Sequence, residues 1–274
     1  MCRTNCCIAV SILLVVTSQH ASGHVLTIDT LPHHSAYLID HGAIRRADSS
    51  TKKMAIVFTG DEFGEGGAVI MAALQKENVK ASFFFTGRFY RNPEFIGLIR
   101  RLKKQGHYLG AHSNDHLLYC DWVKRDSLLV TKQQFNADLD KNYGELRKLG
   151  ITTTNARYFL PPYEWYNDSI AAWTRERGLQ LINFSPGTLS NADYTMPKDN
   201  NYRSSEIIYT SILNQEARHA SGLNGFILLV HIGAGPGRTD KFYKRLPQLV
   251  KWLRKRGYEP VRIDQLLDHA GKAF

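Results

Sequence analysis

Residues 54–66 read M-A-I-V-F-T-G-D-E-F-G-E-G, an apolar run followed by two adjacent carboxylates, Asp61 and Glu62. The first five residues are mostly apolar, β-branched or aromatic, which predicts a buried strand. Gly60 and Gly64 permit an irregular turn after it. Carboxylates add nothing to packing there, and α/β proteins place their chemistry at the carboxyl ends of parallel strands. The alternative is that the acids only cap the next helix and interact with its dipole.

The same order of strand, loop and helix repeats along the chain. The expected strands are seven: 53–58, 80–85, 107–111, 156–160, 179–184, 225–230 and 258–262. The expected helices are 66–77, 93–105, one capped by Thr131, 167–177, 204–220, 241–256 and one after Asp264. Strands that alternate with helices predict an α/β protein with a parallel sheet, most simply curled into a barrel, with an open doubly wound sheet as the alternative.

Length and composition fit one large domain. The chain has 274 residues, of which 43% are hydrophobic and 22% charged, enough to build a full core. The net charge of +10 is compatible with a nucleic acid or an anionic surface as partner. However, the basic residues are spread along the expected helices, and no nucleic-acid motif is visible. We therefore expect solvated helix faces and no nucleic-acid partner, while an acidic glycan stays compatible.

The N-terminus predicts an export signal over residues 1–23. Arg3 precedes an apolar core, Ile8–Val16, which is shorter than the roughly 20 residues that span a bilayer. Small residues at 21–23 offer a cleavage site. We expect an exported protein (periplasm, cell envelope or extracellular) with no membrane span after signal removal, and a retained short anchor is the alternative.

The signal is followed by a leader and a domain. Residues 24–50 are His-rich and irregular, and we expect a leader segment that packs on the domain or dangles. The domain is expected over 51–274. After signal removal Cys120 would be the remaining cysteine, so we expect the core, without an internal disulfide, to hold the domain together.

A second polar stretch, G-A-H-S-N-D-H, follows the third expected strand at residues 110–116. On one helical turn, His112 and His116 would lie on the same face. Two imidazoles so placed can hold a divalent cation with a carboxylate as third ligand. An H-x-x-x-H pair is also common on surfaces, but its position after a strand, level with the acidic pair, favours a metal site.

Three more stretches follow strands. Residues 156–166 contain two prolines followed by three aromatic residues, Tyr163, Trp165 and Tyr166. Such a stiff loop suits stacking on sugar rings or, alternatively, capping of the barrel core. Residues 183–194 follow the fifth strand. His231 ends the most buried expected strand, where it is a general-acid candidate. The glycines after it imitate a phosphate loop, but Pro236 intrudes and no helix starts at once, which argues against a dinucleotide site.

Together these five stretches, in this order, resemble the five motifs of the NodB-homology polysaccharide deacetylases, carbohydrate esterase family 4. The resemblance covers roughly residues 53–263, and H-S-x-x-H and L-x-H are close matches. It implies a distorted (β/α)7 barrel in a single domain. It also implies a hydrolase that removes N- or O-acetyl groups from a glycan such as peptidoglycan, chitin-like oligomers or xylan, with a divalent metal as cofactor.

The resemblance also implies roles for individual residues. Asp61 would be the general base, and Glu62 the third metal ligand beside His112 and His116. The metal would be Zn²⁺, or else Co²⁺, Ni²⁺ or Mn²⁺, and it would activate a water. His231 would protonate the leaving group.

The third motif is implied to bind substrate through Pro161, Tyr163 and Trp165, with the backbone N–H near Tyr163 at the oxyanion. The family sequence F-R-P-P-Y-G is here F-L-P-P-Y-E, so Leu160 replaces the arginine that orients the base. Arg157, three residues earlier, is our candidate to supply that charge.

Two further departures concern the metal and the fourth motif. Glu62 stands where the family has aspartate, which adds one methylene to the proposed ligand. The fourth motif matches poorly, and Asp193 with Tyr194 would stand for its Asp-Trp pair, with Asp193 tuning His231. These departures leave two alternatives open: a catalytically inactive glycan-binding protein on the same barrel, or an amidohydrolase of a small C–N substrate in a narrow pocket.

Overall fold

The computed structural model describes residues 37–268, and the predicted signal peptide and residues 24–36 of the predicted leader lie outside this range. Its centre is a seven-stranded parallel sheet in the order β7-β6-β5-β4-β3-β8, with β9 also paired to β3. The strands are β3 (Lys53–Gly60), β4 (Ser82–Phe85), β5 (Tyr108–Ala111), β6 (Tyr158–Phe159), β7 (Gln180–Leu181), β8 (Ile227–His231) and β9 (Glu259–Val261). This confirms the predicted α/β class and the distorted (β/α)7 arrangement.

The sheet is built around β3. Seven of its eight residues are buried, since it pairs with β4, β8 and β9 and is covered on both faces. Aromatic side chains fill the space beside it, and the rings of Phe58 and Phe83 stack at 4.9 Å between centroids. A strand buried on both faces reads as a continuous apolar run, which is the pattern of the sequence here.

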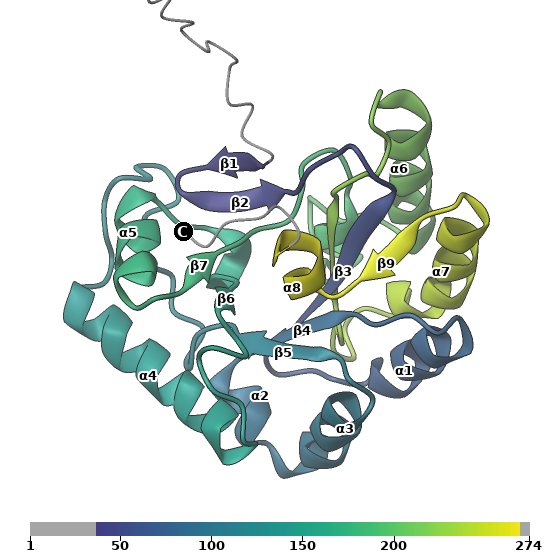
Figure 1. Ribbon diagram of the computed structural model, residues 1–274. Helices are drawn as coiled ribbons and strands as arrows, with labels where there is room; N and C mark the ends of the chain where they lie inside the picture. The colour runs from purple at the N-terminus through teal and green to yellow at the C-terminus, as the bar shows by residue number, and fades with distance from the viewer. Residues whose placement is uncertain (1–36, 269–274) are drawn as a thin grey trace, which may run out of the picture. The chain divides into compact units, whose positions relative to one another are not determined.

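Helices surround the sheet (Figure 1). They are α1 (Gly67–Lys76), α2 (Gly87–Arg91), α3 (Pro93–Lys104), α4 (Lys132–Lys148), α5 (Asp168–Glu176), α6 (Ser205–Arg218), α7 (Leu246–Lys255) and α8 (Ile263–Leu267). The expected caps are present: Thr131 forms a capping box with Gln134, and the Asn167 side chain accepts from the N–H of Ile170. These capping residues explain why the sequence predicts where both helices begin.

The sequence did not indicate a hairpin that lies between the two ends of the sheet. Strands β1 (Leu38–Asp40) and β2 (Ala43–Arg46) pair antiparallel, and β2 makes bridges through Ile44 to Ile182 beyond β7 and through Arg46 to Phe226 beside β8. Figure 1 shows this hairpin beside β7 and above the sheet. The prediction of an irregular segment is therefore wrong for residues 38–46, because they form a paired hairpin. Burial of Ala43 and Ile44 agrees with the alternative in which the leader packs on the domain.

Some element boundaries also differ from the expectation. Strands β6 and β7 are two residues long, where five and six residues were expected, because the chain leaves the sheet to form loops around the pocket described below. Helix α2 was not predicted. Within residues 37–268, no helix is both long and apolar enough to cross a membrane.

Candidate active site

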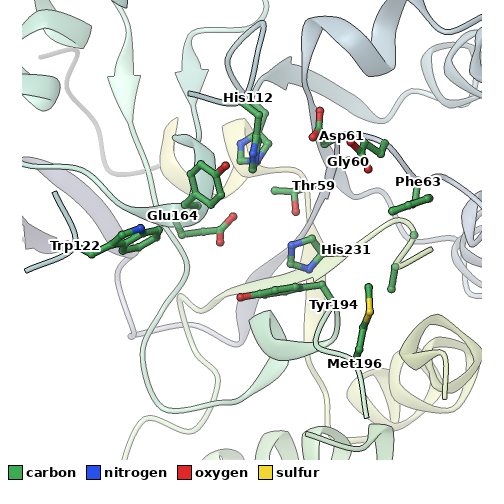
Figure 2. Close-up of a pocket in the computed structure, with 15 residues that line it drawn as sticks. Thr59, Gly60, Asp61, Phe63, His112, Trp122, Glu164, Tyr194, Met196 and His231 are labelled. Atoms are coloured by element: carbon green, nitrogen blue, oxygen red, sulfur yellow. The ribbon is translucent and has the colours of Figure 1, made fainter. Parts of the chain in front are cut away.

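A pocket of about 490 Å³ lies at the carboxyl ends of the strands (Figure 2). Its walls come from the segments that follow β3, β5, β6 and β8, with additions from two loops. Because parallel strands end at the same edge of the sheet, residues far apart in the sequence meet here. Figure 2 shows Asp61 and His112 on one side of the pocket and His231 with Tyr194 on the other.

Asp61 is held in place by the start of α2. The Thr86 hydroxyl donates to Asp61 Oδ1 at 2.8 Å. The Arg88 guanidinium donates from Nε to Oδ1 at 3.1 Å and from Nη2 to Oδ2 at 2.6 Å, a bidentate pair. Oδ1 thus accepts two hydrogen bonds and Oδ2 one, which leaves Oδ2 with a lone pair for a further donor.

His112 and His116 lie side by side in the loop after β5, with ring centroids 5.1 Å apart. They do not share a helical turn as predicted, because His116 and Ser113 have positive φ angles of 54° and 70°. Buried Asp138 of α4 shapes this loop, accepting from the Ser113 hydroxyl and from the backbone N–H groups of the next two residues. The conformation of the loop therefore depends on a carboxylate 23 to 25 residues away from the groups that it binds.

Both imidazoles are neutral at ordinary pH. His112 Nδ1 lies 2.8 Å from the carbonyl oxygen of Leu160, which can only accept, so this nitrogen carries the proton and Nε2 is free. Burial, with the neighbouring His116, lowers the pKa of His112 to about 3. Burial, with the charge of Arg88, lowers the pKa of His116 to about 4. Neutral imidazoles are the form that binds metals.

The three-residue metal site is not assembled. Within residues 37–268, no three His, Cys, Asp or Glu side chains gather closely enough to hold a metal ion. Glu62, the predicted third ligand, is exposed at the pocket rim. The structure therefore does not gather Glu62 with the two histidines into the predicted three-residue cluster, although all three side chains line the same pocket.

On the other side of the pocket His231 is paired with Asp193. His231 Nδ1 lies 2.6 Å from Asp193 Oδ1, and the His231 backbone N–H donates to Oδ2 at 3.0 Å. Burial alone would lower the pKa of His231, but buried Asp193 outweighs it, so the pKa is raised above its ordinary value. Tyr194 covers this pair with its ring centroid 5.1 Å from that of His231.

Exposed aromatic rings line one edge of the pocket. Tyr163 contacts His116 at 4.4 Å between centroids, and Trp122 packs edge-on against Tyr163 at 5.7 Å. Both rings are about half exposed. The ring of Trp165 stacks on that of Trp122. The guanidinium of Arg125 lies over the Trp165 ring, 4.5 Å from its centroid. The rim therefore presents flat apolar surface to solvent.

Part of this chain matches a known protein family. The family model described as polysaccharide deacetylase matches residues 48–182. Over these residues, which are just under half of its length, this chain resembles the polysaccharide deacetylase family. The matched range holds the strands from β3 to β7 and three of the five stretches singled out above, namely those with the acidic pair, the two histidines and the two prolines.

Curated members of the deacetylase family align along most of this chain. The peptidoglycan-N-acetylglucosamine deacetylase of Listeria monocytogenes is 28% identical over 218 residues, which is 79% of this chain and 39% of that protein. The peptidoglycan-N-acetylmuramic acid deacetylase of Bacillus subtilis is 27% identical over 221 residues, 80% of this chain and 73% of that protein. This chain thus spans well under half the length of the Listeria relative.

Solved structures of the deacetylase family share the fold. A family 4 carbohydrate esterase pseudoenzyme from Bacillus anthracis superposes with a TM-score of 0.64 at 18% identity, covering 84% of this chain and 70% of that one. At this identity the likeness supports the fold and says nothing about activity.

Some residues predicted from the deacetylase motifs lie elsewhere. Arg157 precedes β6 and bonds to Asp268 and the Tyr158 hydroxyl, at the opposite end of the sheet from the pocket. The prediction that Arg157 supplies the charge beside Asp61 is wrong, because a residue before a parallel strand faces the other edge. Pro161 is buried and Trp165 stands behind Trp122, so neither lines the pocket.

Sequence reasoning also missed residues of the site. Arg88 takes the place beside Asp61 that was assigned to an arginine of the third motif. The sequence offered a signal for Arg88, since this charged residue follows the F-F-F-T-G run that begins in β4. Trp122 and Glu164 line the pocket as well. Trp122 comes from a loop, and Glu164 stands where the family motif has glycine. No helix or strand periodicity in the sequence marks either residue as part of the site.

Proposed function

We propose that this protein is a deacetylase that hydrolyses acetyl groups on a glycan, peptidoglycan, chitin-like oligomers and xylan being the candidate polymers. The observation that carries the proposal is that Asp61 and His231 face one pocket from opposite sides, each with a partner of opposite charge. Asp61 is held by a bidentate pair with Arg88, while the Asp193 carboxylate raises the pKa of His231. Groups whose environments differ in this way can serve as base and acid in one reaction.

The proposed reaction begins with a water molecule between Asp61 and the acetyl carbonyl. Asp61 Oδ2 accepts a proton from the water as its oxygen bonds to the carbonyl carbon. The resulting oxyanion needs a donor, for which the backbone N–H of Tyr163 is our candidate.

Breakdown of this intermediate needs an acid on the other side. The protonated His231 donates to the sugar nitrogen, or to the sugar oxygen of an O-acetyl group, as its bond to the carbonyl carbon breaks. Acetate and the free amine or hydroxyl result. Asp61 then loses its proton to solvent, and His231 takes one up, which restores both groups.

The exposed rim supports a polymer substrate. Trp122 and Tyr163 present aromatic faces beside the pocket, and such faces offer a large contact area to sugar rings. The two curated relatives named above act on peptidoglycan, according to their names. Export, with action outside the cytoplasm, is part of the proposal, and N-terminal sequencing of protein recovered from the cell envelope or medium tests it.

A divalent ion, with Zn²⁺ as first candidate, belongs to the proposal through His112 and His116, whose neutral imidazoles suit it. The mechanism above rests on the side chains of the chain itself, because the third predicted ligand is not in place.

Acetate release from a substrate panel tests the function. The panel contains chitooligosaccharides, peptidoglycan and acetylated xylan, and the protein is assayed after chelation and after return of Zn²⁺, Co²⁺, Ni²⁺ or Mn²⁺. We expect release from at least one polymer, with Asp61→Asn inactive and the exposed control Asp126→Asn unaffected. Tight glycan binding with no release from any substrate would instead establish a glycan-binding protein.

A further inference from the structure

Glu164 occupies an unusual backbone position at the end of the third motif. It has a φ of 52° and follows Tyr163 with a φ of 58°, so two consecutive residues are left-handed. Glycine adopts this conformation freely, whereas other residues strain the backbone by about 1–3 kcal/mol. A glutamate kept at such a position suggests that its side chain has a purpose.

The Glu164 carboxylate points into the pocket, toward Thr59 and His231 in Figure 2. Its backbone is anchored, because the N–H donates to Pro161 and the carbonyl accepts from Asn183. By contrast, no residue in 37–268 makes a hydrogen bond or ion pair with its carboxylate. Burial raises the pKa of Glu164 to about 7, an effect that nearby His231 opposes and Asp193 adds to.

A second polar group in the same pocket lacks a partner. Thr59 Oγ1 is buried, its residue being 1% exposed, and within the described part of the chain it has no hydrogen bond. Thr59 is in register with His231 on the neighbouring strand, which places it on the floor of the pocket. Leaving Thr59 Oγ1 buried without a partner costs free energy, and the partly buried Glu164 carboxylate beside it has no partner either, so both groups favour a ligand that bonds to them.

The charges of the pocket decide which ligand fits. Asp61 is balanced by Arg88, and His231 by Asp193, while the two loop histidines are neutral. Glu164 is thus the carboxylate in the interior of the pocket without a balancing cation among residues 37–268. A sugar hydroxyl can donate to it, whereas a substrate carboxylate beside it would be repelled and desolvated.

We propose that Glu164 is a specificity-determining residue that selects sugar units with free hydroxyls, such as N-acetylglucosamine, over units with a carboxylate, such as N-acetylmuramic acid. This inference rests on the proposed deacetylase function. The two classes differ by a lactyl ether whose carboxylate would enter a pocket that already holds Glu164. The basic surface of the protein can still attract an anionic polymer, because the selection acts at the unit inside the pocket.

A matched pair of ligands tests the charge alone. One is the monosaccharide N-acetylmuramic acid, and the other is the same sugar with the lactyl carboxylate converted to an amide, so that neither ligand carries an N-acetylglucosamine unit that could occupy the pocket instead. Binding is measured by calorimetry at about pH 8.5, above the pKa of Glu164, so that its carboxylate is ionised. The protein is the full chain carrying Asp61→Asn, which prevents turnover, with and without Glu164→Gln. We expect the amide to bind at least ~10-fold more tightly, about 1.4 kcal/mol, and the ratio to fall below ~3 with Glu164→Gln.

Two further variants keep the test interpretable. Glu164→Gly removes the charge and relieves the left-handed strain, so it should lose the same discrimination and melt at a higher temperature. Glu94→Gln, an exposed acid on α3, should leave the ratio unchanged. A ratio that stays the same in Glu164→Gln, or that Glu94→Gln changes as much, overturns the inference.

Acetate release separates this failure from failure of the proposed function. If wild-type protein and Glu164→Gln release acetate from chitooligosaccharides and from N-acetylmuramic acid units in the same proportion, the specificity inference fails and the deacetylase stands. If no ligand binds and no acetate is released, both fail.

Discussion

Arg88 and Asp61 form a bidentate ion pair across the start of α2, with Nη2 2.6 Å from Oδ2 and Nε 3.1 Å from Oδ1. The pair joins the turn after β3 to α2, the helix that follows the neighbouring strand β4. The guanidinium fork fits the carboxylate plane and fixes its rotation, so Arg88 is a positioning residue for the proposed base.

Replacing Arg88 should impair catalysis more than binding. Arg88→Gln frees the Asp61 carboxylate to rotate, and misplacement of a base costs roughly 10- to 100-fold in rate. We expect kcat for acetate release to fall by that factor while KM changes little, with part of the loss recovered in Arg88→Lys.

The control for Arg88 lies on the same helix. Arg91→Gln removes a bond to Asn114 and an ion pair with Glu145 without touching Asp61, and it should keep kcat within about twofold. Equal losses of kcat in both variants would mean that α2 is merely destabilised.

Asp193 should set the alkaline limit of activity through His231. The raised pKa of His231 keeps it protonated below that value, so the proposed acid is lost as pH rises through it. In Asp193→Asn burial dominates, and the pKa should fall below the ordinary value of about 6.5. The alkaline limb of the kcat profile should then move to lower pH, and NMR titration of the His231 ring should show the same shift.

The glycan affinity of Asp193→Asn should stay near that of the wild type, because Asp193 is buried behind the histidine. An unchanged alkaline limb, together with an unchanged His231 titration, would remove Asp193 from the proposed mechanism.

Metal binding should depend on the histidines and be insensitive to Glu62. We expect calorimetric binding of Zn²⁺ to chelator-treated protein, lost on His112→Ala and on His116→Ala. Glu62→Gln should bind Zn²⁺ within about threefold of the wild type, since Glu62 is exposed at the rim. A loss on Glu62→Gln as large as that on His112→Ala would show that this side chain swings inward to complete the site.

Restoring the family arginine at position 160 should not improve the enzyme. Leu160 is fully buried, and Asp61 already has Arg88 as its partner. Leu160→Arg would bury a charge without a counterion, which destabilises a fold by several kcal/mol.

The measurement for position 160 is urea unfolding, with Leu160→Met as the size-matched control that should cost under ~1.5 kcal/mol. A stable Leu160→Arg protein with a higher kcat than the wild type would contradict the assignment of Arg88 as the functional substitute.

The alternation of strands and helices, and the motifs that end the strands, were determined by local sequence. Continuous apolar runs such as Met54–Phe58 specify strands buried on both faces, and caps such as Thr131 and Asn167 specify helix starts. The carboxyl ends of parallel strands lie at one edge of the sheet, so the sequence predicts Asp61 and His231 at the same edge.

Tertiary structure alone decided which side chains meet there. Arg88 reaches Asp61, Asp138 shapes the histidine loop, and β2 lies between β7 and β8, through contacts between segments far apart in the chain. Glu62 is exposed at the pocket rim, whereas its sequence neighbour Asp61 is partly buried. The physical reason is that periodicity and capping act over a few residues, whereas the partner of a loop side chain depends on how whole strands and helices pack.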